Sequence, residues 1–169
     1  MDTNYKLQDT RYKLGFTIVE LLIVIGITVI MAGIGGATYM GLRERERIDQ
    51  MSNRIAADMR ATMARAQAQE GGNQWGMHFD NVTSSNPFYA IWYGATDSTY
   101  GSGSTTWGTV TFVATGLKFT APGAGSSTDL IFVKPYGLPS AAATITITST
   151  ATLASSRTVS IDTNGNITY

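Results

Sequence analysis

A run of 22 residues without a charged side chain, residues 21–42, constrains the fold of this chain more than any other feature. As an α-helix the run would be about 33 Å long, because each residue adds about 1.5 Å. The hydrocarbon core of a bilayer is about 30 Å thick, so the run predicts a single membrane-spanning helix. Basic residues lie on both sides of the run, and charge therefore orients the helix only weakly.

Glu20 stands directly before this apolar run. A carboxylate near the centre of a membrane costs roughly 2.5–3.5 kcal/mol on insertion scales, and such residues are usually functional. At the depth of the lipid headgroups the same carboxylate would cost little. An ordinary secretory signal, cut behind the small residues of the segment 31–37 (MAGIGGA), is an alternative that leaves Glu20 unexplained.

The segment 13–24, KLGFTIVELLIV, joins a polar start of the chain to the apolar run. It resembles the class III signal of type IV prepilins, with a basic residue, a Gly-Phe pair and a glutamate at a fixed offset. The resemblance implies that residues 1–15 are a leader, which a prepilin peptidase removes by cutting after Gly15 on the cytoplasmic side. It also implies N-methylation of Phe16 as the new amino terminus. Glu20 would act in assembly, by pairing with the amino terminus of a neighbouring subunit.

The chemistry of a buried carboxylate fits this assembly role, because such a group needs a partner and a buried polar pair can specify register. Many pilins carry a proline in the mature helix, and this chain has glycines there instead. The cluster at residues 33–36 has two interpretations. Glycine weakens a helix interior by about 1 kcal/mol relative to alanine, which would make the helix flexible here. Small residues also allow membrane helices to pack closely.

Residues 43–70 are dense in charge, and the helix is expected to continue through them. Apolar residues recur every three or four positions, which predicts one buried face; they are Ile48, Met51, Ile55, Met59, Met63 and Ala66. Gly71 and Gly72 predict its end, so the whole helix would cover residues 16–70, about 80 Å. The run 43–47 (RERER) predicts a solvated face with ion pairs at i,i+3, with contact to anionic lipid headgroups as the alternative.

Residues 71–169 have a different composition, with 30 Ser or Thr among 99 residues and only three Lys or Arg. This composition favours β-structure. The predicted strands are 75–80, 88–93, 109–115, 129–134, 143–149, 157–162 and 166–169, with a hairpin turn at Asn164-Gly165 and a flexible surface loop over 96–106. The expected fold is therefore α+β and pilin-like: a long amino-terminal helix, with a transmembrane first half (16–42) and an amphipathic second half (43–70), packed on an antiparallel β-sheet domain (71–169).

This β-rich part is similar, more loosely, to the GspH/FimT family of minor pilins and pseudopilins. The similarity lies in short motifs, namely 75–79 (WGMHF), 129–132 (DLIF), the strand 145–148 and 157–161 (RTVSI) before Asn164-Gly165. It implies a structural subunit of a type II secretion pseudopilus or a type IV pilus. The chain would be a single-pass protein of the bacterial inner membrane with its globular domain on the periplasmic or extracellular side, and it would be incorporated into a filament with other pilins.

Other kinds of site find little support in the sequence. His78, the one histidine, has no neighbouring cluster with metal-ligand spacing and is expected to be a packing or surface residue. We expect no metal, no cofactor, no small-molecule substrate and no enzymatic activity, because no catalytic constellation is present. Some FimT-like proteins bind DNA, but Lys118, Lys134 and Arg157 are few for phosphate capture, which argues against a nucleic-acid partner. A DNA-binding minor pilin and a membrane-anchored surface binding module remain the alternatives.

Overall fold

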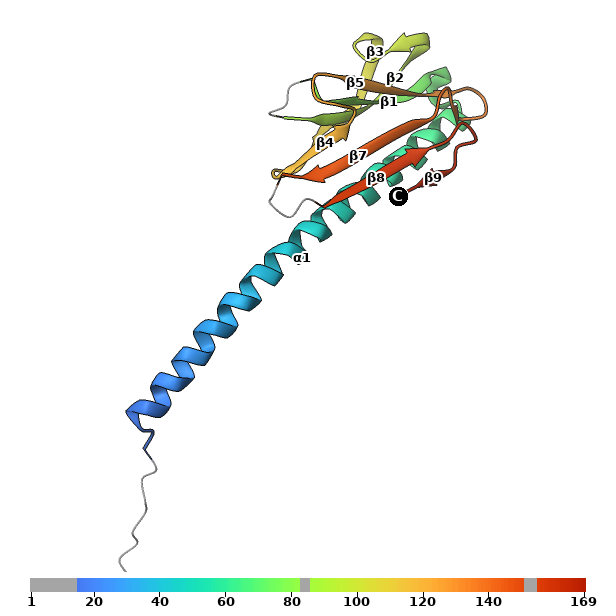
Figure 1. Ribbon diagram of the computed structural model, residues 1–169. Helices are drawn as coiled ribbons and strands as arrows, with labels where there is room; N and C mark the ends of the chain where they lie inside the picture. Colours follow the sequence, from blue (N-terminus) through green and yellow to red (C-terminus); the bar gives the residue numbers. More distant parts are fainter. Residues whose placement is uncertain (1–14, 83–85, 151–154) are drawn as a thin grey trace, which may run out of the picture. The chain divides into compact units, whose positions relative to one another are not determined.

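The computed structural model describes residues 15–82, 86–150 and 155–169, and for residues 35–38 it describes the backbone alone (Figure 1). The chain divides into two units, Met1–Met40 and Gly41–Tyr169. One α-helix, α1 (Ile18–Gln67), contributes to both units. The remaining elements all belong to the second unit.

Helix α1 starts at a side-chain cap. The hydroxyl of Thr17 accepts a hydrogen bond from the backbone N–H of Glu20 at 3.2 Å, which satisfies one of the free donors of the first turn. The helix ends at Gln67, three residues before the expected end. A 3-10 turn, η1 (Glu70–Gly72), follows it, and Gly71 and Gly72 have φ angles of +64° and +69°. The two glycines therefore form the left-handed exit from the helical segment, although the α-helix itself stops earlier than predicted.

The described residues of the second unit form nine strands in two antiparallel sheets. The five-stranded sheet has the order β3-β2-β1-β5-β6 and the four-stranded sheet has the order β4-β7-β8-β9. The strands are β1 (Gln74–Asp80), β2 (Phe88–Thr99), β3 (Ser102–Phe112), β4 (Leu117–Ala121), β5 (Ser127–Val133), β6 (Leu138–Pro139), β7 (Ala143–Ser149), β8 (Ser156–Ile161) and β9 (Ile167–Thr168). The α+β class and the antiparallel sheet structure are as expected.

Several features of the β-rich part differ from the prediction. The segment 96–106 is not a flexible loop, because β2 continues to Thr99 and β3 begins at Ser102, so that most of the segment belongs to a long hairpin. The strand expected at 109–115 overlaps only the end of β3, which begins at Ser102 and ends at Phe112. Strands β4 and β6 were not predicted.

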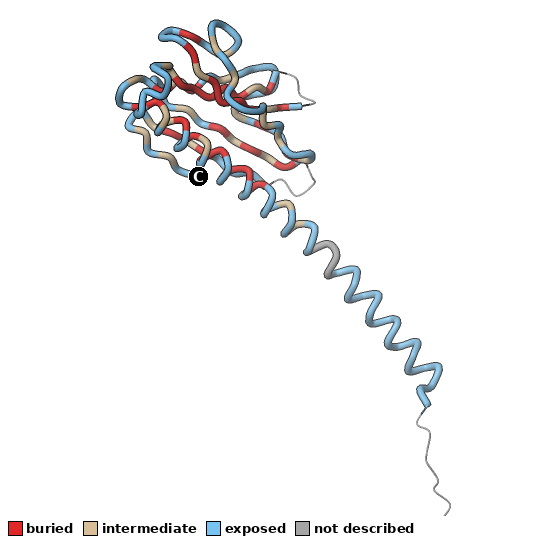
Figure 2. Tube along the Cα trace, turned by 180° about the vertical axis from the view of Figure 1, so that it is seen from behind, coloured by how far each residue is buried: buried red, intermediate tan, exposed pale blue. Residues whose placement is uncertain are grey.

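The core of the second unit lies between α1 and the inner faces of both sheets (Figure 2). The predicted apolar stripe of the helix is confirmed: Ile48, Met51, Ile55, Met59 and Ala66 are buried and Met63 is partly buried. The sheets contribute alternate residues, as a pleated strand with one covered face requires. The largest of these fully buried side chains are Phe79, Tyr89, Phe132, Met77, Leu130, Ile145, Ile147 and Ile161.

Three polar contacts fix α1 to the strands around this core. The Tyr89 hydroxyl donates to Asp58 Oδ2 at 2.6 Å. Arg157 Nε lies 2.7 Å from Asp49 Oδ1, and Ser149 Oγ donates to Glu44 Oε1 at 2.7 Å. Burial, together with the hydrogen bond to Asp58, raises the pKa of Tyr89 well above its ordinary value, so this phenol stays protonated and remains a donor.

The outer face of the four-stranded sheet carries rows of hydroxyl groups. Thr144, Thr146 and Thr148 of β7 alternate with buried isoleucines, which confirms the predicted alternation. The hydroxyls pair across the strands, in the pairs Thr120–Thr148 at 3.0 Å, Thr146–Thr158 at 3.1 Å and Ser160–Thr168 at 2.7 Å. Cross-strand pairs of this kind add stability to a sheet on its wet side.

Candidate functional site

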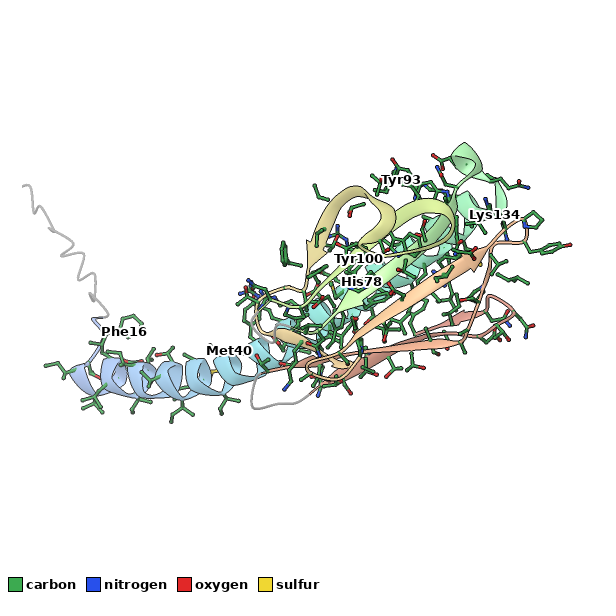
Figure 3. The ribbon with its side chains drawn as sticks, turned by 90° about the horizontal axis from the view of Figure 1, so that it is seen from above. Phe16, Met40, His78, Tyr93, Tyr100 and Lys134 are labelled. Atoms are coloured by element: carbon green, nitrogen blue, oxygen red, sulfur yellow. The ribbon has the colours of Figure 1, made fainter. Side chains whose placement is uncertain are left out.

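The predicted processing site lies at the amino-terminal edge of the described chain. Residues 1–14 of the expected leader fall outside the described residues. Gly15 and Phe16 precede α1, and both are exposed. A side chain on Gly15 would meet no atom within 4 Å, and the Phe16 side chain is 80% exposed (Figure 3). Leader cleavage after Gly15 and methylation of Phe16 remain predictions.

The first unit presents an apolar surface on all sides of α1. Every side chain described from Phe16 to Ile34 is exposed (Figure 2). Helix α1 is long and apolar enough to cross a membrane, and none of its most apolar window is buried within the chain. An exposed apolar surface of this kind marks a contact with lipid or with other proteins. The length, hydropathy and exposure of this segment support the predicted anchoring by a single membrane-spanning helix.

Glu20 lies in the first turn of α1, with its side chain exposed. Its backbone N–H is capped by Thr17, and the two residues have the spacing of a capping box, T-x-x-E. The helix dipole also favours a carboxylate in the first turn. Thr17 therefore has a local structural role as the cap of α1 that was not predicted, although the T-x-x-E pattern was its signal. Pairing of Glu20 with the amine of a neighbouring subunit remains a prediction.

The charged segment after the apolar run forms the predicted type of ion pair. Arg47 Nη1 lies 3.8 Å from Glu44 Oε2, at i,i+3 on the helix. Because the other carboxylate oxygen of Glu44 accepts the hydrogen bond from Ser149, Glu44 joins the start of the second unit's helix to the end of β7. This segment is thus part of the packed unit. A solvated face was predicted for residues 43–47, but the Glu44 carboxylate contacts β7.

His78 is a packing residue, as expected, but its neighbours were not foreseen. The register pairs His78 of β1 with Asp129 of β5, and Nδ1 lies 2.8 Å from Asp129 Oδ1. On the other side, Nε2 lies 3.6 Å from Asp80 Oδ2. Asp80 and Asp129, which are far apart in the sequence, therefore both lie next to His78. Among the described residues, no group of three or more such side chains has an arrangement that could hold a metal ion.

The three basic side chains of the β-rich part lie in separate segments: on β4, in the turn after β5 and on β8. Lys118 is exposed on β4. Lys134 follows β5 and donates to the carbonyl of Gly72 at 2.6 Å, while Arg157 of β8 pairs with Asp49. The fold therefore gives two of the three cations a partner within the chain. The absence of a nucleic-acid partner stays a prediction.

Comparison of the chain with protein-family models, with curated proteins and with solved structures finds no match. The residues themselves define an α+β chain with one amino-terminal helix that is able to span a membrane.

Proposed function

We propose that the protein is a pilin-like subunit, made as a prepilin and incorporated as a minor pilin or pseudopilin into a type IV pilus or a type II secretion pseudopilus. The observation that carries the proposal is helix α1. It is 50 residues long, follows directly on Gly15-Phe16 and Thr17, and has Glu20 in its first turn. Its first part exposes apolar side chains, whereas its second part buries a stripe against two antiparallel sheets.

This division of one helix suits a subunit that exists in two environments. In the bilayer, the apolar part satisfies its backbone internally and is covered by lipid. In a filament, the same surface is covered by the helices of other subunits, so assembly moves apolar area from one apolar medium to another at little cost. The globular unit lies on the periplasmic or extracellular side of the bacterial inner membrane. Its partners are the prepilin peptidase, other pilins and the membrane, and it has a structural rather than an enzymatic role.

Glu20 supplies the specificity that apolar contacts lack. A carboxylate near the amino end of α1 would meet the amine that cleavage creates at Phe16 of a neighbouring subunit. A charge pair within an apolar bundle favours one stagger of the helices over others. The capping bond to Thr17 holds the first turn in shape while the carboxylate stays exposed for this contact.

The mass of the mature protein tests the proposal. The full chain is produced in cells with an active prepilin peptidase and in matched cells without one, and the intact protein is weighed. We expect loss of residues 1–15 and the gain of one methyl group on Phe16, only when the peptidase is present. Gly15→Leu is expected to leave the precursor uncut. A mature chain that keeps Met1, or one that is cut behind the small residues of 31–37, would refute the proposal.

A further inference from the structure

A groove on the second unit lies between β2 and β5. Its volume is about 370 Å³, within the usual range for sites of small ligands. One wall is the segment 96–99 near the end of β2, and the other consists of Ile131, Val133 and Lys134. Gln74 and Ser140 complete the lining. We propose that this groove binds an uncharged saccharide.

The lining has the chemistry that a sugar ring requires. Ile131 and Val133 provide an apolar surface for the C–H face of the ring. Around them stand hydroxyl groups, the amide of Gln74 and the carboxylate of Asp97, which together offer both donors and acceptors to a polyol. Lys134 is the single cation and Asp97 the single anion of the lining, so the groove has no net charge to attract a charged ligand.

The wall formed by β2 is held in a defined conformation by hydrogen bonds. The register between β2 and β3 shifts between Gly94 and Thr99, which sets the segment between them out of the regular ladder. Asp97 has a φ angle of +70°, a conformation that non-glycine residues rarely adopt. Its N–H donates to Gln74 Oε1 at 3.1 Å, and Ser98 Oγ donates to the carbonyl of Gly103 at 3.0 Å. Such strained residues persist where the surroundings hold them, and they cluster at binding sites.

A second observation lies next to the groove. The indole N–H of Trp92 is buried without a hydrogen-bond partner among the described residues. Its ring lies over Gly76 of β1, and Gly76 pairs with Ile131, which lines the groove. An unpaired buried donor is unusual in a folded protein and calls for an acceptor. Trp92 does not line the groove itself, so its indole N–H serves as a nearby reporter of binding at Ile131 rather than as a ligand contact.

The inference does not depend on filament assembly, because binding is measured on the purified full chain. The detergent must be zwitterionic and free of sugar, since a glycoside detergent would compete. Cellobiose, lactose and chitobiose serve as probes, and triglycine is the non-saccharide comparison. The readout is the indole N–H signals in a proton–nitrogen NMR spectrum, in which the loss of one signal in Trp92→Phe identifies that of Trp92.

We expect at least one of the three disaccharides to shift the Trp92 signal in a saturable way. Asp97→Asn removes the charge but tolerates a positive φ, and it should weaken binding roughly ten- to hundredfold, the range for a lost hydrogen bond to a charged group. Lys134→Gln should also weaken binding, whereas Lys118→Gln, a matched change on β4, should not. No shift with any disaccharide, an equal shift with triglycine, or unchanged binding by Asp97→Asn would overturn the proposal.

Discussion

The imidazole of His78 lies parallel to the phenol ring of Tyr100, with their centroids 4.1 Å apart and their planes at 10° (Figure 3). His78 is in the middle of β1, and Tyr100 is in the turn between β2 and β3. Because His78 alternates with the core residues Met77 and Phe79, the stack lies on the sheet face opposite the core. The turn of the hairpin is therefore held against that face by one aromatic contact.

Removing this contact should loosen the hairpin locally. Aromatic pairs contribute about 0.5–1.5 kcal/mol beyond the area they bury, so Tyr100→Ala should lower the free energy of unfolding by at least that amount. Amide hydrogen exchange should rise in the residues of the β2–β3 turn more than elsewhere. Tyr136→Ala, at a site where the side chain is 71% exposed, is the matched control and should change little. Equal effects of the two substitutions would mean that the stack does not hold the hairpin.

Gly76→Ala should be among the most damaging single changes in the second unit. A Cβ at this position would lie 2.5 Å from the ring of Trp92, which is fully buried, so the ring or the strand would have to shift. Overpacking of a core typically costs about 1–3 kcal/mol, and denaturant unfolding measures it. Gly123→Ala, where the nearest atom would be 3.8 Å away, serves as the control. Adding Trp92→Phe to Gly76→Ala should recover part of the lost stability. If the double variant is no more stable than Gly76→Ala, the clash with the Trp92 ring is not the cause of the loss.

The turn at Asp162 should make the second unit sensitive to acid. Hydrogen bonds from the Asn166 side chain and backbone, and from the Asn164 N–H, lower the pKa of Asp162 below its ordinary value of 3.8. A lowered folded-state pKa stabilises the protein above the unfolded-state pKa, and this contribution is lost as the pH falls through the folded-state value. The difference in stability between the wild type and Asp162→Asn should therefore be present at neutral pH and shrink below pH 3.8. A difference that does not change with pH would contradict this account.

Glu20→Val tests the proposed assembly role of Glu20. Removing one member of a buried charge pair costs about 3–5 kcal/mol, so the substitution should impair incorporation into the filament while sparing membrane insertion and leader cleavage. Cross-linking to partner pilins in membranes, together with piliation or secretion, provides the measurement. Thr17→Ala removes only the cap and is the matched control. If Glu20→Val leaves cross-links and function unchanged, or if Thr17→Ala has the same effect as Glu20→Val, Glu20 does not dock the subunit.

The second unit should fold without the apolar segment. Its core begins at Ile48, so a fragment of residues 47–169 should form a soluble, monomeric α+β domain. A fragment of residues 41–169 also keeps the bond between Glu44 and Ser149 and should be the more stable of the two. Circular dichroism and thermal unfolding test both fragments. An unfolded 47–169 fragment beside a folded 41–169 fragment would move the boundary towards Glu44.

The sequence predicted the elements that carry a strong local signal. The stripe from Ile48 to Ala66 has helical periodicity, and Asn164-Gly165 has the chemistry of a tight turn, with Gly165 at a φ of +83°. The segment 96–106 has few apolar residues and no alternation of apolar and polar residues. Its strands form through backbone pairing and the hydrogen bond from Ser98 to the carbonyl of Gly103, which no local sequence pattern indicates. Strand β4 has the sequence LKFTA, in which buried Leu117 and Phe119 alternate with exposed Lys118 and Thr120, so its signal was present but was not used.

The environment of His78 could not be predicted for a different reason. His78 and Asp129 are 51 residues apart, and only the register of β1 on β5 brings them together. The walls of the groove likewise come from β2 and from β5 with the residues after it. By contrast, Gly15, Phe16 and Glu20 are neighbours in the chain, so their arrangement is already present in the sequence.

The scarcity of basic residues in the two sheets has a practical consequence for detecting this subunit. Trypsin cuts after Lys and Arg, and none occurs between Arg65 and Lys118. Lys134 precedes Pro135, a bond that trypsin rarely cleaves, and Arg157 is held by Asp49 in the folded state. Digestion of residues 66–169 therefore yields a few long peptides, and α1 yields one almost wholly apolar segment beside several short peptides from residues 44–65. Surveys that count tryptic peptides will undercount the protein, and a second protease that cuts at aromatic residues will improve its coverage.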